Sequence, residues 1–167
     1  MRDFRMQSVD PSSLASDLKT LAKNSKALNQ LTDELTKQVG QIEAVINALN
    51  LGLPDWVVVD ESSEPEDDWT HYIRLWYDKN DDGRWGLTIE DFEEYDLDPD
   101  RRRNQKTWAF KDAPRRLRLK AVGYIPALLK DLVKLSDELT KETEATLAQA
   151  KDIASNLYKP ALDGPEK

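Results

Sequence analysis

Two long amphipathic segments at the ends of the chain limit what this sequence can fold into. In the first, apolar residues recur at alternating four- and three-residue steps from Leu14 to Leu49. Nine of the eleven positions in this pattern are apolar. A spacing that averages about 3.5 residues keeps one apolar seam along a helix, as in a coiled coil. Since Gly52 suits a C-terminal cap, the pattern predicts a coiled-coil helix over residues 10–52.

The second segment has the same character and lies near the other end of the chain. Asp112 and Pro114 are typical of a helix start, because Asp can cap free amide groups and proline is tolerated in the first turn. The seam then continues to Leu157. We expect a helix over residues 112–158, with a bend near Pro126 because proline removes one backbone hydrogen bond.

The two seams correspond when the helices run antiparallel. Both are rich in Leu, Ile and Val near the centre of the chain and become more polar toward its ends. Such agreement between distant segments favours an intramolecular hairpin of helices. The alternative is that each helix pairs with another chain. Outside the helices, we expect a flexible N-terminus (residues 1–9) and a disordered tail (residues 159–167).

Residues 53–111, between the two helices, have a different composition. All five tryptophans lie here, among short runs of β-branched and aromatic residues. The alternation from Arg84 to Glu90, preceded by the loop from Asp78 to Gly83, predicts a β-hairpin. The chain is therefore predicted to be α+β and mostly α. Its expected fold is a long antiparallel coiled-coil helical hairpin, with a small three- to four-stranded antiparallel β-meander inserted between the two helices.

The loop of this hairpin contains a partial calcium-binding motif. Asp78, Asn80 and Asp82 match the first, third and fifth positions of an EF-hand loop, and Gly83 matches the sixth. The twelfth position, which should supply a bidentate carboxylate, is Ile89. The flanking segments are also predicted strands rather than helices. An acidic hairpin turn explains the loop better than a metal site, and we expect neither a metal nor a cofactor.

Charge is distributed unevenly along the chain. Residues 60–100 contain 16 acidic and three basic residues, whereas residues 101–120 contain nine basic residues and one acidic residue. The basic strip could hold phosphates and stack on bases, or the two strips could neutralise each other within the fold. The candidate partner-binding residues of the basic strip are Arg101, Arg102, Arg103, Lys106, Trp108, Arg115 and Arg116.

Composition and motifs narrow the classes of function. The net charge of −8 opposes attraction of the whole protein to nucleic acid or to an anionic membrane. No apolar run is long enough to span a bilayer. The sequence contains no cysteine, which fits a cytoplasmic location. The only histidine, His71, lies on the same side of a predicted strand as Ile73 and Leu75, so we expect a partly buried, hydrogen-bonded side chain and name no catalytic residue.

Apolar residues beside the seams indicate a protein partner. They are Leu31 and Val45 in the first helix and Leu129 and Val133 in the second. A two-helix coil cannot bury them together with its seam, so we expect a dimer or coil face there, with a homodimer as one form of the partner. The sequence predicts a non-enzymatic protein–protein interaction or adaptor module. The alternatives are a nucleic-acid accessory protein that uses residues 101–120, and an acidic inhibitor or decoy that binds a basic partner surface.

Overall fold

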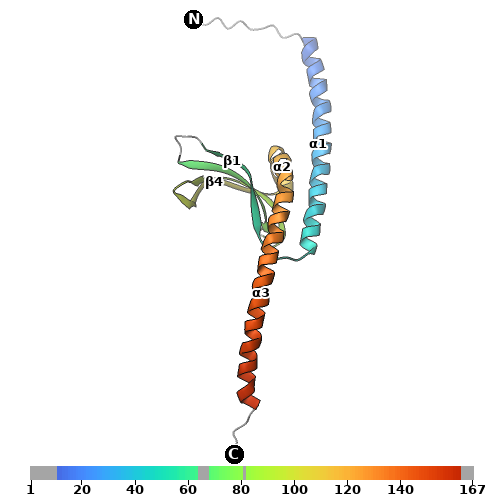
Figure 1. The fold of residues 1–167 in the computed structure, drawn as a ribbon. Helices are drawn as coiled ribbons and strands as arrows, with labels where there is room; N and C mark the ends of the chain where they lie inside the picture. The colour runs from blue at the N-terminus through green and yellow to red at the C-terminus, as the bar shows by residue number, and fades with distance from the viewer. Residues whose placement is uncertain (1–10, 64–67, 81, 163–167) are drawn as a thin grey trace, which may run out of the picture. The chain divides into compact units, whose positions relative to one another are not determined.

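The computed structural model describes residues 11–63, 68–80 and 82–162 of the chain. The predicted flexible residues 1–9, and residues 163–167 of the predicted tail, lie outside these ranges. The elements in chain order are α1 (Pro11–Ala48), β1 (Asp55–Ser63), β2 (Trp69–Lys79), β3 (Trp85–Tyr95), β4 (Asp98–Ala109), the 3₁₀ turn η1 (Phe110–Asp112), α2 (Arg115–Ala121), the 3₁₀ turn η2 (Val122–Tyr124) and α3 (Ile125–Leu162) (Figure 1). The chain forms two units, residues 1–44 and 45–167, and each is described by itself.

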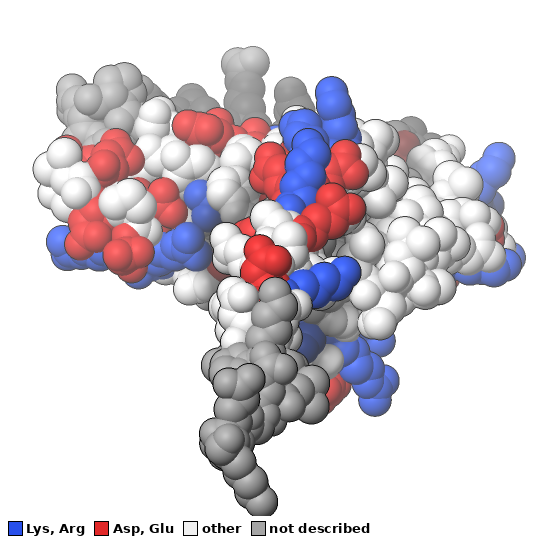
Figure 2. Space-filling view, turned by 60° about the horizontal axis from the view of Figure 1, so that its bottom comes forward, with Lys and Arg blue, Asp and Glu red and all other residues white. Residues whose placement is uncertain are grey.

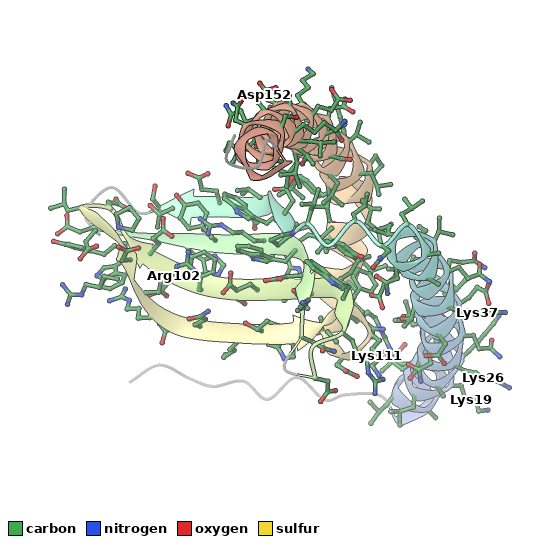
Figure 3. All side chains as sticks on the ribbon, turned by 90° about the horizontal axis from the view of Figure 1, so that it is seen from below. Lys19, Lys26, Lys37, Arg102, Lys111 and Asp152 are labelled. Atoms are coloured by element: carbon green, nitrogen blue, oxygen red, sulfur yellow. The ribbon has the colours of Figure 1, made fainter. Side chains whose placement is uncertain are left out.

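The first unit is the greater part of α1, a helix whose two sides differ. Several of its apolar side chains, including Leu14, Leu18 and Leu21, are exposed, whereas Val39 is buried. Lys19 and Lys26 project together with a third lysine from one side of this helix (Figure 3). Because a helix turns by about 100° per residue, these lysines lie opposite the leucines. Of the helices in the described ranges, none combines the length and the apolar character needed to cross a membrane.

The end of α1 belongs to the second unit and is hydrogen-bonded to the sheet. Asn47 accepts a hydrogen bond from the hydroxyl of Tyr77 at 2.7 Å, and its amide donates to the carbonyl oxygen of Trp85 at 3.1 Å. The helix ends at Ala48, after which Asn50 and Gly52 have φ angles of +50° and +66°. Asn and Gly tolerate this left-handed conformation better than other residues, so the local sequence explains where the helix stops.

The sheet is an antiparallel meander in the order β1-β2-β3-β4. The central pair, β2 and β3, keeps one register along its whole length, with Leu75 opposite Ile89. The two outer pairs contain register shifts, one between Val58 and Asp60 and two in the pairing of β3 with β4. Irregularities of this kind bend a strand and increase its twist.

The C-terminal helices cover one face of the sheet and form the core with it. Leu75, Leu87 and Ile89 on the strands are 0–1% exposed. On the helical side, the residues that are 0–4% exposed are Ala121, Ile125, Leu128 and Leu132. α2 contacts β3, and the first turns of α3 contact β1 and β2, whereas the rest of α3 continues beyond the sheet (Figure 1). The core therefore lies between the sheet and the part of the helical segment formed by α2 and the first turns of α3.

The prediction of a coiled-coil helical hairpin was wrong, although the α+β class and the antiparallel meander are present. The structure has a long helix, then a four-stranded antiparallel sheet, then a C-terminal helix. The central seam residues of the C-terminal helix, such as Leu128 and Leu132, are buried against the sheet, while Leu139 and Ile153 remain exposed. A sheet offers a broader apolar surface than the stripe of one helix, so it takes up the same side chains that a coiled coil would have used.

The C-terminal helical segment is interrupted where a bend was expected. The 3₁₀ turn η2 separates α2 from α3, and Pro126 is the second residue of α3. In that first turn a proline removes no hydrogen bond that the helix needs. The interruption leaves Ala121 and Ile125, on its two sides, both buried.

The packing of α3 on the sheet predicts a contrast between two leucines of the same helix. Leu132→Ala is expected to lower the free energy of unfolding by about 2–5 kcal/mol, because it leaves a cavity in the core. Leu147→Ala, at an exposed position, is expected to change it by less than about 0.5 kcal/mol. Urea denaturation followed by tryptophan fluorescence measures both values, since all five tryptophans lie in strands. Equal effects of the two substitutions would contradict the packing described here.

Candidate functional site

The second face of the sheet carries aromatic and charged side chains. Successive residues of a strand point to opposite faces, so the residues that alternate with the core positions point away from α2 and α3. Trp56 is 38% exposed on this face, and Tyr72 and Trp76 are half-buried. We call this surface the open face and define it by Trp56, Tyr72, Arg74, Trp76, Glu90, Phe92 and Glu94.

At the centre of the open face, Arg74 is surrounded by aromatic rings. Only 7% of this arginine is exposed. Its guanidinium carbon lies 4.2 Å from the ring centroid of Trp56, 5.0 Å from that of Tyr72 and 4.6 Å from that of Phe92. A cation over an aromatic face is attracted by the negative charge density of the ring. Arg74 thus covers apolar rings that would otherwise face water.

The same cluster contains a second arginine and a shared carboxylate. The guanidinium carbon of Arg102 lies 4.5 Å from the ring centroid of Phe92. One oxygen of Glu94 lies 3.5 Å from Arg74 Nη2 and 3.5 Å from Arg102 Nε. Phe92 is fully buried although it lies on the face opposite the helices. The guanidinium groups of Arg74 and Arg102 therefore cover the ring of Phe92 and shield it from solvent.

Glu90 is a buried carboxylate beside this cluster, with 6% of its surface exposed. Its Oε2 accepts a hydrogen bond from the indole N–H of Trp76 at 3.0 Å, and its Oε1 accepts one from the side-chain amide of Gln105 at 2.6 Å. Arg102 Nη1 lies 3.8 Å from Oε1. The indole of Trp76 also packs against Trp56, with 5.7 Å between ring centroids. Glu90 therefore fixes the orientation of an aromatic ring at the surface.

The acidic and basic strips of the sequence lie side by side as β3 and β4. Glu94 is opposite Arg102 in the register, and Glu93 is opposite Arg103. Arg103 forms an ion pair with Glu93, and Lys106 is opposite an aspartate of β3. Figure 2 shows basic and acidic side chains intermixed over the sheet rather than gathered into one patch of a single sign. Of the two alternatives left open by the sequence, the geometry favours mutual neutralisation.

The other candidate residues of the basic strip are spread over two elements. Arg101 stacks near Trp69 and Tyr95, with its guanidinium carbon 5.4 and 5.1 Å from their ring centroids. Arg115 is half-buried and Arg116 is exposed, both on α2. The seven predicted residues therefore do not form one free cationic surface, because the arginines of β4 contact acidic or aromatic side chains.

A cavity of about 410 Å³ opens on the same face, near the turn between β2 and β3. Trp76 and Trp108 are among the residues that line it. Asp78, Glu90 and Arg102 contribute charged groups to its walls. Arg102 lies on the open face opposite Glu94, whereas Trp108 is opposite Ile89, so the indole of Trp108 points to the helix-covered face.

The loop that resembles part of an EF-hand is a hairpin turn. The side-chain oxygen of Asn80 accepts hydrogen bonds from the backbone N–H groups of Asp82 and Arg84, at 3.1 and 2.9 Å. Asp78 accepts one from the N–H of the next residue at 2.6 Å. Gly83 has a φ angle of +74°, a conformation that glycine adopts easily. In the described part of the chain, no three His, Cys, Asp or Glu side chains are grouped so as to hold a metal ion.

His71 is hydrogen-bonded, as the sequence suggested. Its Nε2 lies 2.8 Å from an oxygen of Asp91, and about a third of each side chain is exposed. This pair lies on the same face of the sheet as Ile73. It links β2 to β3 and serves as a cross-strand contact.

The residues predicted to form a dimer or coil face are exposed. Leu31 and Val45 on α1, and Leu129 and Val133 on α3, all retain a large exposed fraction. Leu129 and Val133 line an apolar groove of about 370 Å³ together with Leu49, which follows directly after α1. Beyond the sheet, Leu139, Leu147 and Ile153 are 43%, 52% and 61% exposed, and we call these three residues the α3 stripe.

Ion pairs shift the pKa values of several groups around the sheet. The side chain of Lys120 lowers the pKa of Asp60, and the guanidinium of Arg103 lowers the pKa of Glu93. Burial raises the pKa of the Tyr72 hydroxyl above its ordinary value. The two lowered carboxyl pKa values mean that the folded protein holds these groups ionised in mildly acidic solution.

Sequence reasoning missed the residues that organise the open face, above all Arg74 and Glu90. The alternation that the sequence shows from Arg84 to Glu90 also runs through β2. Extended to Tyr72, Arg74 and Trp76, it would have placed these side chains together on the opposite face. The depth of burial of Arg74 could not have been inferred, because it depends on rings from three strands.

Comparisons with protein-family models, with curated proteins and with solved structures found no match for this chain. What the protein does must therefore be inferred from its own side chains.

The burial of Arg74 predicts a large effect from removing its charge. Arg74→Met keeps an apolar stem but loses the guanidinium that covers three rings, so the free energy of unfolding is expected to fall by about 2–4 kcal/mol. Arg84→Met is the control, since Arg84 is exposed in the turn immediately before β3. Urea denaturation measures both. A loss for Arg74→Met no greater than that for Arg84→Met would show that the cluster contributes little to stability.

The lowered pKa values of Asp60 and Glu93 predict how stability depends on pH. Since these carboxyls release protons more readily in the folded state, the unfolded chain binds more protons in acid, and stability falls as the pH falls. The loss is expected as the pH drops through and below the ordinary carboxylate range of roughly pH 4–4.5. The double variant D60N/E93Q should show a shallower decline in denaturation midpoint. D152N, which changes an exposed residue of α3 (Figure 3), should follow the parent, and identical curves for all three proteins would contradict this assignment.

Proposed function

We propose that this protein is a non-enzymatic interaction module that binds another protein through the apolar sides of its long helices. The observation that carries the proposal is the α3 stripe, in which Leu139, Leu147 and Ile153 are exposed on a helix that continues beyond the sheet. Isolated helices are only marginally stable in water. Exposed leucine and isoleucine side chains on such a helix are stabilised when another helix covers them.

α1 supports the same proposal independently. Leu14, Leu18, Leu21, Leu28 and Leu31 are exposed along it, and we call these five residues the α1 stripe. The lysines that Figure 3 labels on α1 project from one side of the helix, which the helical period places opposite the leucines. A helix with this division of residues presents an apolar side to a partner while its charged side stays in water.

A second copy of this chain is the first partner to test. In a symmetric dimer each copy contributes the same surface, so one stripe can cover another without a new complementary sequence. The nucleic-acid alternative has less support, because Arg102 and Arg103 are paired with glutamates of β3. The decoy alternative is weakened by the same pairing, which also neutralises the acidic strand. The cysteine-free sequence supports a cytoplasmic location.

Two matched pairs of substitutions test the helix stripes. Leu28→Asp and Ile153→Asp place a charge in the α1 and α3 stripes, whereas Gln30→Asp and Ser155→Asp place the same charge two residues away, on the opposite side of each helix. We expect sedimentation to show concentration-dependent self-association of the parent and both controls, and its loss in the stripe variants.

If the parent is monomeric at all concentrations, the partner is a different protein. Affinity purification should then recover a protein with the parent and both controls that is lost with Ile153→Asp or Leu28→Asp. Association that is equal in all five proteins, or no association of any kind, would remove the stripes as the binding surface. Far-UV circular dichroism of each variant checks that α1 and α3 remain helical.

A further inference from the structure

The part of α3 that continues beyond the sheet carries a shallow groove of about 410 Å³, which we call the α3 groove. Its lining residues are Leu139, Glu142, Thr143, Thr146, Leu147 and Ala150. Thr143, Thr146 and Ala150 follow Leu139 at steps of four, three and four residues, so all four lie on one side of the helix. Because three of the four have short side chains, the α3 groove has room for larger apolar side chains of a neighbouring helix.

α1 presents the large side chains that such a groove accepts. Four leucines of the α1 stripe, Leu14, Leu18, Leu21 and Leu28, are 47–62% exposed. Their spacing of four, three and seven residues places them on one side of α1. The residues that line the α3 groove are exposed as well. Since neither surface is covered within one chain, a second copy is the source of the missing contact.

We propose that the α1 stripe of one copy packs antiparallel into the α3 groove of a second copy. This inference rests on the proposed function and specifies which surface of the partner each stripe contacts. In an antiparallel pair, a register with Leu21 opposite Ala150 also places Leu28 opposite Thr143, so that each large side chain meets a small one. In a symmetric dimer the reciprocal contact forms as well, and one two-fold axis relates the two contacts.

The charges of the two segments favour this pairing over the pairing of like helices. Residues 13–31 of α1 contain three lysines and one aspartate, a formal net charge of +2, whereas residues 137–153 of α3 contain five acidic residues and two lysines, a formal net charge of −3. Two α1 segments would repel each other, and so would two α3 segments, but α1 and α3 attract. Because the lysines that Figure 3 labels lie away from the leucines, we expect these charges to select the partner helix more than to strengthen binding.

Disulfide crosslinking of the full-length protein tests the proposed contact, because the chain contains no cysteine of its own. Leu21→Cys and Ala150→Cys are made as separate proteins. Each is oxidised alone and, after mixing under reducing conditions, together with the other. A disulfide forms only when the two Cα atoms come within roughly 7 Å. On a non-reducing gel we expect about tenfold more covalent dimer in the mixture than in either protein alone.

A second pair and a control test the register. Leu28→Cys mixed with Thr143→Cys should crosslink in the same way, because both positions face each other in the proposed register. Lys23→Cys mixed with Ala150→Cys should give little covalent dimer, since Lys23 lies on the side of α1 away from the leucines. All five positions are exposed, so we expect every variant to fold.

Sedimentation of the parent separates this inference from the proposed function. If the parent self-associates but neither mixed pair crosslinks more than its single variants, the contact between α1 and α3 is wrong, while the stripes remain a binding surface. Equal crosslinking of a single variant and its mixture would overturn the contact too, because it would indicate pairing of like helices. A parent that is monomeric at all concentrations would also overturn it, and the proposed function would then require a different protein as the partner.

Discussion

β3 joins the whole sheet together because its two faces make two different kinds of interaction. Leu87 and Ile89 point toward the helices and form the centre of the apolar core. Glu90, Phe92 and Glu94 point the other way and organise the arginines and aromatic rings of the open face. A shift of one residue in the pairing of this strand would exchange these two sets and bury carboxylates in the core. The alternation of β3 therefore specifies both the register of the sheet and the surface that carries the cavity.

The pairing of an acidic strand with a basic strand explains why an uneven charge pattern produces no strongly charged surface. Glu93 and Glu94 meet Arg103 and Arg102 directly across the β3–β4 pair. Their partial exposure means that each pair contributes little stability by itself. The pairing matters mainly for ligand recognition. Because these arginines are paired, the nine basic residues of the strip do not act as one cationic site. What remains available on the open face is a locally neutral set of donors and acceptors beside aromatic rings.

The sequence was sufficient to place the helices and strands but not to decide what the helices pack against. Apolar residues at alternating four- and three-residue steps indicate which side of a helix is apolar. Leu128 and Leu132 are indeed buried on that side. It does not state whether the partner is a helix or a sheet, since both bury the same side chains. The open face was harder to foresee, because the burial of Arg74 requires rings from β1, β2 and β3 at once. Such a cluster becomes evident only when the register of all three strands is known.

The apolar side of the C-terminal helix is continuous, yet its surroundings change partway along it. Up to Leu132 the sheet covers these residues, and from Leu139 onward no described residue of the second unit buries them. The sheet contributes the packing energy for the first part alone, so the exposed part must rely on helix propensity, which is weak over this length. Covering the stripe from Leu139 to Ile153 would supply the missing packing. If a partner binds the α3 stripe as proposed, its binding also stabilises the helix that presents the stripe.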